Sequence, residues 1–284
     1  MKLLVLTDIH GNSTALFAVL QKVRRQSIDR IIFCGDYITD FPGFSAVLKT
    51  VREKSDYAVK GNREINCLRY VKGEREQIDR YLQLRSLRWC YNSLTKEELD
   101  FIKALPEQAE GTLCGRKILI FHGSPSSNSE VLKIDRDKEK IESYLKNAKA
   151  DLLIGGHSHR PFVHSLSGKM FVNAGSIGLG FTRPCTAEYA VVDITASNIT
   201  AEIGYAEYSY AETERQVRKS ALYPQAPVWS ELLLWAVRTA TNKPMEYIRY
   251  VQAQTGISSE KGKPLDDTLW EQWYPRFCRE HAKE

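Results

Sequence analysis

Short apolar runs that each end in a glycine or a polar side chain constrain the fold of this chain more than any other sequence feature. Six of them occur in the first 175 residues: KLLVLTD (2–8), RIIFCGD (30–36), DYAVKGN (56–62), KILIFHG (117–123), DLLIGGH (151–157) and KMFVNAG (169–175). Near-continuous runs of Val, Ile and Leu of this length are typical of strands that are buried on both faces. Each run is therefore predicted to be a strand that brings a polar residue to the edge of a sheet.

Helical patterns lie between these runs. They have polar or charged starts, and they cover residues 14–25, 97–105 and 137–147. Thr95 and Glu98 form the pattern of a capping box at the start of the second one. Strands that alternate with helices indicate an α/β domain. Two further strands, at 187–193 and 199–207, are expected to complete the sheet system.

The character of the chain changes after residue 207. Four of the five tryptophans lie there, on predicted helices at 230–239, from Pro244 to Gly256, and in a last segment that follows a linker at 257–264. We therefore divide the chain into a catalytic domain of residues 1–206 and a helical, aromatic-rich C-terminal extension of residues 207–284. The tryptophans are expected to form a small core against the domain; the alternative is a lid or a dimer surface that presents rings to a nucleobase.

Seven side chains with oxygen or nitrogen ligand atoms follow the predicted strands, and they are Asp8, His10, Asp36, Asn62, His122, His157 and His159. Four of the six histidines in the chain belong to this set. Because open α/β sheets bind ligands at the carboxyl ends of their strands, we expect the seven to meet at the same edge of one sheet. Asp and His without Cys favour divalent metals of intermediate hardness, such as Mn, Fe, Zn or Ni.

The ordered series Asp8-x-His10, Gly35-Asp36, Gly61-Asn62, His122 and Gly156-His157-x-His159 resembles the calcineurin-like metallophosphoesterase family over about residues 1–205. It is most similar to the small bacterial and archaeal phosphodiesterase branch that begins DIHGN. The resemblance implies an α/β (α+β) fold of two packed mixed β-sheets flanked by helices, a four-layer sandwich, here with a C-terminal helical extension. It also implies two divalent metal ions, with Mn favoured over Fe, Zn or Ni.

The resemblance divides the seven side chains between these two ions. Asp8, His10 and His159 would hold one ion, Asn62, His122 and His157 the other, and Asp36 would bridge them. Asp36, Asn62 and His122 would form the catalytic set. The implied activity is hydrolysis of phosphodiester or phosphoanhydride bonds by a metal-bridging hydroxide. A small, nucleotide-like substrate, such as a dinucleoside polyphosphate, is the expected partner.

The residue after Asn62 departs from many relatives, which carry a histidine there that can protonate the leaving group. Arg63 cannot take that role because a guanidinium stays protonated. Leaving groups that depart without help, such as a nucleotide, are therefore favoured. Arg63 either binds a substrate phosphate or pairs with Glu64, and both alternatives stay open. Arg183 is a second candidate phosphate contact, although an exposed structural role is favoured for it.

Composition and charge argue against several other classes of protein. The net charge is +5, but the positive residues are scattered, so we expect no dedicated nucleic-acid patch. The N-terminus lacks the pattern of a signal peptide, and no run is long enough to cross a membrane. The six cysteines are widely spaced without a C-x-x-C pair, which favours reduced thiols and a cytoplasmic protein. A homodimer stays open.

Two other functions compete with a phosphodiesterase. The first is a non-catalytic scaffold that keeps this fold for protein binding. We disfavour it because all seven ligand positions are filled. The second is a phosphomonoesterase or protein phosphatase, which Arg63 and the short loops around the predicted site disfavour.

Overall fold

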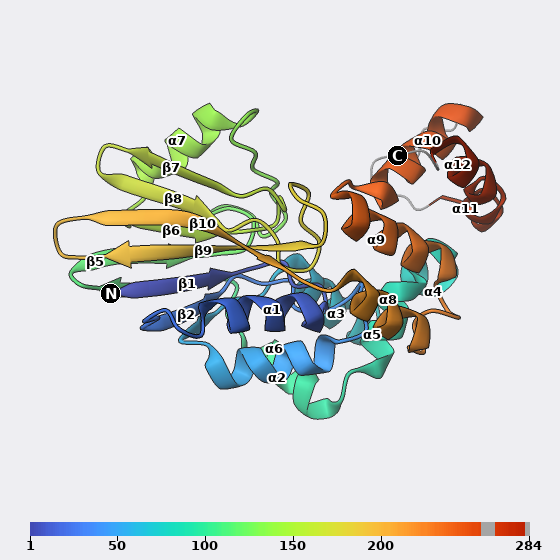
Figure 1. Ribbon diagram of the computed structural model, residues 1–284, viewed down its shortest axis with the longest axis horizontal. Coiled ribbons are helices and arrows are strands. Elements are labelled where there is room, and N and C mark those ends of the chain that lie inside the picture. Colours follow the sequence, from blue (N-terminus) through green and yellow to red (C-terminus); the bar gives the residue numbers. More distant parts are fainter. Residues whose placement is uncertain (257–264, 282–284) are drawn as a thin grey trace.

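The computed structural model describes residues 1–256 and 265–281. Within these residues, two five-stranded mixed sheets pack face to face, with helices on their outer faces and a separate group of helices beyond one end of the sheets (Figure 1). This arrangement confirms the predicted fold class, with its two packed mixed sheets and its C-terminal helical extension.

The first sheet contains the strand at the N-terminus. Its strands are β1 (Lys2–Leu6), β2 (Arg30–Phe33), β3 (Tyr57–Ala58), β9 (Thr186–Ile194) and β10 (Ile199–Glu207), in the order β10-β9-β1-β2-β3. The pairs β1–β2 and β2–β3 are parallel, with Val5 opposite Ile32 in the first of them. The pairs β1–β9 and β9–β10 are antiparallel. The three parallel strands therefore present their carboxyl ends at one edge.

The second sheet has a similar mixed topology. Its strands are β4 (Ala109–Leu113), β5 (Arg116–Ile120), β6 (Leu152–Gly155), β7 (Phe162–Leu166) and β8 (Lys169–Asn173), in the order β4-β5-β6-β8-β7. The central pairs β5–β6 and β6–β8 are parallel, whereas β4 and β7 run antiparallel to their neighbours. The sequence prediction missed β4 and β7, because both are edge strands with partly exposed residues and no continuous apolar run.

The alternation of side chains along β1 explains why its run is apolar throughout. Leu4 and Leu6 belong to the cluster beneath the helices, and Leu3 and Val5 belong to the cluster between the two sheets. A strand covered on both faces needs an apolar residue at every position. The helices beside the first sheet are α1 (Ser13–Val23), α2 (Phe44–Lys54) and α6 (Lys96–Ala104), and α7 (Lys138–Asn147) covers the second sheet.

The chain between β3 and α6 is helical as well, which the sequence did not indicate. It forms α3 (Asn62–Val71), α4 (Glu76–Arg80), a short 3-10 turn (Leu82–Leu84) and α5 (Arg85–Ser93). The predicted capping box at α6 is present. Thr95 Oγ1 accepts from the Glu98 N–H at 3.2 Å, and the Glu98 carboxylate accepts from the Thr95 N–H at 2.9 Å.

The C-terminal extension consists of helices with a core of their own. They are α8 (Tyr210–Lys219), α9 (Pro227–Thr239), α10 (Lys243–Thr255), α11 (Asp267–Gln272) and α12 (Tyr274–His281). Trp270 is buried in the core of α9 to α12, as expected of a packing residue. A second cluster joins Leu233 and Leu234 of α9 to Phe41 and Leu179 of the sandwich. The division at residue 206 stays a prediction, and the linker predicted at 257–264 lies outside the described residues.

No helix in residues 1–256 or 265–281 has the length and apolar character needed to cross a membrane. The six cysteines are all free thiols, and Cys34, Cys67 and Cys90 are buried.

Candidate metal centre

The seven predicted ligands meet where the two sheets end side by side. Asp8 and His10 follow β1, Asp36 follows β2, Asn62 begins α3 after β3, His122 follows β5, and His157 and His159 follow β6. The expectation that they share the edge of one sheet is wrong, because β1, β2 and β3 belong to the first sheet and β5 and β6 to the second. The packing of the two sheets creates the site: five strand ends from two layers converge on it.

Three of the side chains form a first donor group. His10 Nε2 lies 3.1 Å from His159 Nε2, and His159 Nε2 lies 3.2 Å from Asp8 Oδ1. Asp8 Oδ1 is buried and accepts no hydrogen bond from the part of the chain that the structure describes. The other oxygen of Asp8 accepts from the Thr7 hydroxyl at 2.7 Å and from the His157 N–H at 2.8 Å. A buried carboxylate oxygen that faces two imidazole nitrogens is suited to a cation.

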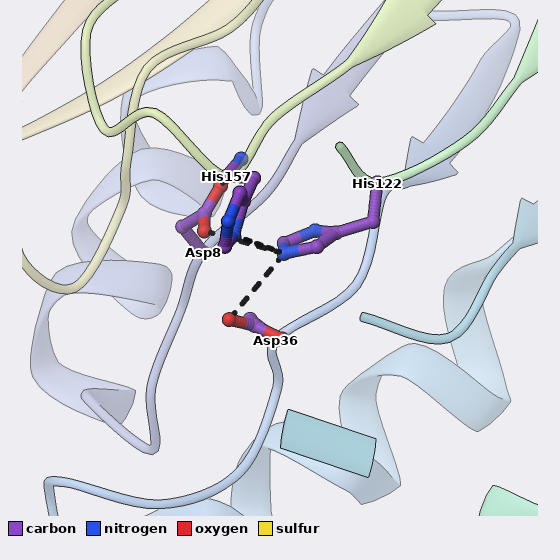
Figure 2. A group of neighbouring side chains, drawn as sticks. All are labelled: Asp8, Asp36, His122 and His157. Atoms are coloured by element: carbon purple, nitrogen blue, oxygen red, sulfur yellow. Dashed lines mark hydrogen bonds and ion pairs between the residues drawn. The ribbon is translucent and has the colours of Figure 1, made fainter. Parts of the chain in front are cut away.

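A second donor group surrounds His122, and Figure 2 shows His122 with Asp36 and His157 of this group and with Asp8. His122 Nε2 lies 3.1 Å from Asn62 Oδ1, 3.2 Å from His157 Nδ1 and 3.4 Å from Asp36 Oδ2. His122 is fully buried between the loops that follow β2 and β6. The group therefore offers two imidazole nitrogens, an amide oxygen and a carboxylate oxygen to one point.

Two carboxylates lie between these groups. Asp36 Oδ2 is 3.7 Å from His10 Nε2 and 3.4 Å from His122 Nε2. Asp8 Oδ1 is 3.8 Å from His10 Nε2 and 3.9 Å from His122 Nε2. The family resemblance gives the bridging role to Asp36 alone, whereas this geometry puts both carboxylates within reach of both groups. The assignment of individual ligands to individual ions stays a prediction.

The outer nitrogens of the histidines fix how the inner ones point. His122 Nδ1 lies 2.7 Å from the carbonyl oxygen of Cys34, and His159 Nδ1 lies 2.7 Å from that of Leu179. A carbonyl oxygen only accepts, so each Nδ1 carries a proton, and in the neutral ring each Nε2 turns a lone pair inward. Lone pairs that face one another across about 3 Å repel unless a positive charge lies between them. The residues present therefore fit divalent cations.

The backbone at the centre is strained. Five of the predicted ligands have a positive φ: Asp8 (52°), His10 (51°), Asp36 (54°), His157 (67°) and His159 (52°). This left-handed region is unfavourable for residues with a Cβ, and such strain gathers at functional sites. Close packing adds a second constraint at Gly61, where a Cβ would lie 2.1 Å from Asp36 Oδ1. The loops are thus held in shape around the donor atoms.

Comparison with known proteins identifies the family. The sequence profile described as the calcineurin-like phosphoesterase superfamily domain matches residues 1–197. The chain belongs to this superfamily. An uncharacterized protein of Methanocaldococcus jannaschii is 26% identical over 242 residues, which are 79% of this chain and 93% of that protein. The family resemblance stated from the sequence is confirmed.

Two crystal structures share the fold of this phosphoesterase. A metallophosphoesterase from Sphaerobacter thermophilus has a TM-score of 0.68 at 22% identity, and the match covers 85% of this chain and 99% of that one. A hypothetical protein from Pyrococcus horikoshii has a TM-score of 0.72 at 19% identity, with 84% and 98% covered. The covered share of this chain, 84–85%, is larger than the 206 of 284 residues that precede the C-terminal extension, so part of the extension also has a counterpart in these folds.

Glu64 holds two loops of the centre together through backbone hydrogen bonds, a role that the sequence does not indicate. Its buried carboxylate accepts from the N–H groups of Asp36 (2.9 Å), Gly61 (2.8 Å) and Tyr37 (2.9 Å), and more distantly from Ile38 (3.3 Å). Burial and the nearby Asp36 raise the pKa of this carboxyl. Glu64 therefore ties the loop after β2 to the start of α3. The alternative that it pairs with Arg63 is wrong, since its oxygens serve these amides.

Arg63 instead faces two other acids. Its guanidinium lies 3.5 Å from Asp40 and 4.0 Å from Asp36, and a quarter of the side chain is exposed to the cavity beside the metal centre. Arg183 lies elsewhere, over the ring of Tyr205 at 3.7 Å, and it does not line this cavity. The structure thus brings Arg63 to the site of the phosphoesterase and leaves Arg183 away from it.

Asp40 and Trp229 form a chain of contacts behind His10 that the sequence analysis also missed. His10 Nδ1 lies 2.8 Å from Asp40 Oδ2 as a buried ion pair, and Trp229 Nε1 donates to Asp40 Oδ1 at 3.0 Å. A carboxylate behind a ligating histidine fixes the ring and raises its basicity. Asp40 could have been suspected from its place four residues after Asp36. Trp229 carries no local signal, because it is 189 positions away from Asp40.

Substitution of Trp229 by phenylalanine is expected to weaken metal binding. The change keeps an aromatic ring in α9 but removes the hydrogen bond to Asp40, and loss of outer contacts at metal sites costs about 10–100-fold in affinity or activity. We expect a loss near tenfold in Mn²⁺ affinity, measured as the metal dependence of kcat/KM. Trp235→Phe is the matched control, since Trp235 lies on the same helix and its Nε1 has no hydrogen-bond partner among the described residues. Equal losses in the two variants would refute the role of Trp229.

The protonation of the histidines predicts how pH acts on the metal-free phosphoesterase. Burial alone would lower the pKa of His10, but Asp40 and Asp8 raise it to about 10. Burial would also lower the pKa of His122, but Asp36 and Asp8 outweigh this effect and raise it to about 9. His157 behaves oppositely, since burial and His122 lower its pKa to about 4. When no metal is bound, the positive charges of His10 and His122 therefore balance the negative charges of the carboxylates.

Chelator-treated protein is therefore expected to lose stability as the pH rises from 7 to 9. A histidine whose pKa is raised by folding stabilises the folded state. This contribution is complete at pH values below the ordinary histidine pKa, and it disappears as the pH rises through the folded-state pKa. Added Mn²⁺ replaces the protons, so the increase in Tm that it causes should be larger at pH 9 than at pH 7. Thermal unfolding with and without Mn²⁺ checks this. A metal-induced increase that shrinks with pH would contradict it.

Proposed function

We propose that this phosphoesterase hydrolyses phosphodiester or phosphoanhydride bonds of a small, nucleotide-like substrate with two divalent cations, Mn²⁺ being favoured. The observation that carries the proposal is the pair of donor groups with Asp8 and Asp36 between them. Hydrolytic two-metal sites hold their ions about 3.5–4 Å apart, and carboxylates within reach of both positions are what such a site needs. The free thiols of the chain suit a reducing compartment, which favours the cytoplasm.

The chain's own residues would divide the work of binding and orientation. Asp8, His10 and His159 would hold one cation, and Asn62, His122 and His157 the other, with Asp36 between them. When bound, such cations lower the pKa of water and neutralise charge on phosphoryl oxygens. Asp40 and the carbonyl oxygens behind the imidazoles keep the rings in place. Among the described residues that line the cavity, Ser158 in the ligand loop is the one serine or cysteine.

The identity of the residue after Asn62 favours good leaving groups. Arg63 stays charged because Asp40 and Asp36 raise its pKa against the effect of burial, so it has no proton to give to a departing oxygen. Its partly exposed guanidinium is placed to contact an anionic oxygen of the substrate. Nucleotides and nitrophenolate leave without protonation more readily than simple alkoxides. This supports a diester of an acidic leaving group over a phosphoprotein.

The test is hydrolysis of bis-p-nitrophenyl phosphate and of p-nitrophenyl phosphate by chelator-stripped protein, before and after addition of Mn²⁺. We expect no hydrolysis before the addition and preferential cleavage of the diester after it. Cleavage of the monoester alone would favour a phosphomonoesterase. Metal binding without cleavage of either ester would favour the non-catalytic scaffold. Bound metal is measured on the same samples, so that these outcomes are separable.

A further inference from the structure

A cavity of about 520 Å³ lies between the metal centre and the C-terminal extension. The predicted ligands His10, His157 and His159 line it on one side. The other side is lined by residues after α9 and on α10, which are Ala240, Thr241, Asn242, Pro244, Met245, Glu246 and Arg249. Binding pockets for small molecules start at about 300 Å³. The cavity therefore has room for more than the phosphate that the metal centre would hold.

Three positively charged side chains line this cavity and have no ion-pair partner among the described residues. Lys133 follows β5, Arg160 follows the ligand loop after β6, and Arg249 lies on α10. The other charged groups of the lining are compensated: Arg63 faces Asp40, and Glu246 lies 2.9 Å from Lys243. The cavity thus has an excess of positive charge beyond that of the metal centre.

The three charges come from three separate elements, one of them in the extension. Scattered basic residues on a convex surface are simply solvated, but like charges that converge on a concave wall repel one another and attract an anion. Arginine in particular presents a planar fork that matches phosphate oxygens. The apolar part of the lining, which includes Phe181, Leu233 and Met245, offers a surface for a non-charged portion of the same ligand. Phe181 is already stacked on His159, with ring centroids 5.3 Å apart.

We propose that the substrate carries a second phosphate group, apart from the one that is hydrolysed, and that Arg249, Arg160 and Lys133 bind it. The substrate class is then a nucleotide ester with at least two phosphates. This inference rests on the proposed function, because it takes the metal centre as the place of the scissile phosphate. It assigns to α10 a direct part in choosing the substrate.

The kinetic test uses two substrates that differ only in the second phosphate: the 5′-p-nitrophenyl phosphodiester of thymidine, with and without a 3′-phosphate. Binding of ADP and of AMP to the Mn²⁺-loaded protein, at fixed free Mn²⁺, gives a second comparison in which the added phosphate is attached directly. We expect the extra phosphate to improve kcat/KM or Kd by about tenfold, the change expected for one additional charge-assisted contact. In Arg249→Gln and in Arg160→Gln/Arg249→Gln that ratio should fall towards one.

The control is Arg52→Gln, which removes an exposed arginine on α2, outside this cavity. It should keep the tenfold ratio. A ratio near one in both comparisons for the unaltered protein would overturn the proposal, as would a ratio that the double variant keeps. If the protein cleaves neither thymidine ester, the proposed function fails, and the ADP and AMP binding ratio in the variants still decides for or against the second phosphate site.

Discussion

Asp36→Asn is expected to lower kcat/KM for a phosphodiester by at least about a thousandfold. The substitution keeps the size of the side chain, and an amide oxygen can still accept from the Arg63 N–H that now donates to Asp36 Oδ1 at 2.8 Å. It removes the negative charge that lies between the two donor groups. Metal ions contribute several kcal/mol to transition-state stabilisation, and each 1.4 kcal/mol or so is a factor of ten in rate.

The measurement is the hydrolysis of bis-p-nitrophenyl phosphate together with the number of Mn²⁺ ions bound per chain. We expect fewer bound ions in Asp36→Asn and an unchanged circular dichroism spectrum. Asp100→Asn is the control, since Asp100 is an exposed carboxylate on α6 whose ion-pair partner among the described residues is Lys103, at 3.2 Å. If Asp36→Asn binds the full complement of metal and retains more than about a tenth of the activity, the bridging role of Asp36 is wrong.

Glu64→Ala is expected to destabilise the metal-free protein by about 4 kcal/mol, since each buried donor left without an acceptor costs about 1–3 kcal/mol. Three backbone N–H groups within 2.9 Å of the carboxylate would lose their partner. The raised pKa of Glu64 shows that holding the ionised form in this site is itself unfavourable, which reduces the net loss below the sum of the contacts. Glu64→Gln retains one acceptor oxygen, so we expect about half the effect.

Urea-induced unfolding of the chelator-treated variants measures this. The chain provides a matched control in Glu98→Ala, which removes the same kind of contact at the start of α6, where Glu98 accepts from the Thr95 N–H at a solvent-accessible helix end. Loss of a cap at such a place costs about 1 kcal/mol. Similar losses at the two positions would show that burial of the Glu64 contacts adds nothing.

The residues that the sequence predicts as donors lie together in the structure, whereas the contacts that support them were not predicted. Asp8, His122 and His157 were found because each follows an apolar run, and the run itself reports the strand that positions them. Asp40 and Glu64 act through contacts with loops whose shape is set by tertiary packing. Trp229 belongs to a helix that meets the sandwich only in three dimensions. No periodicity in the sequence indicates such a contact.

The fold shows the same limit. The central strands were predicted because burial on both faces forces an unbroken apolar run, as in β6, where all four residues are buried. The distribution of these strands between two sheets was not predicted, since strands of either sheet look alike in sequence. The helices from α3 to α5 were missed because their charged, irregular pattern has a narrow apolar stripe, and tertiary packing overrides weak propensity there.

The left-handed backbone at Asp8, His10, Asp36, His157 and His159 bears on which residues can stand at these positions. A residue with a Cβ in this conformation costs about 1–2 kcal/mol relative to glycine. In a chain that did not need the donors, glycine or asparagine at these positions would relieve this backbone strain. The aspartates and histidines at these five positions are therefore kept against the preference of the backbone, and a scaffold that keeps this loop shape without binding metal is expected to carry glycine or asparagine there.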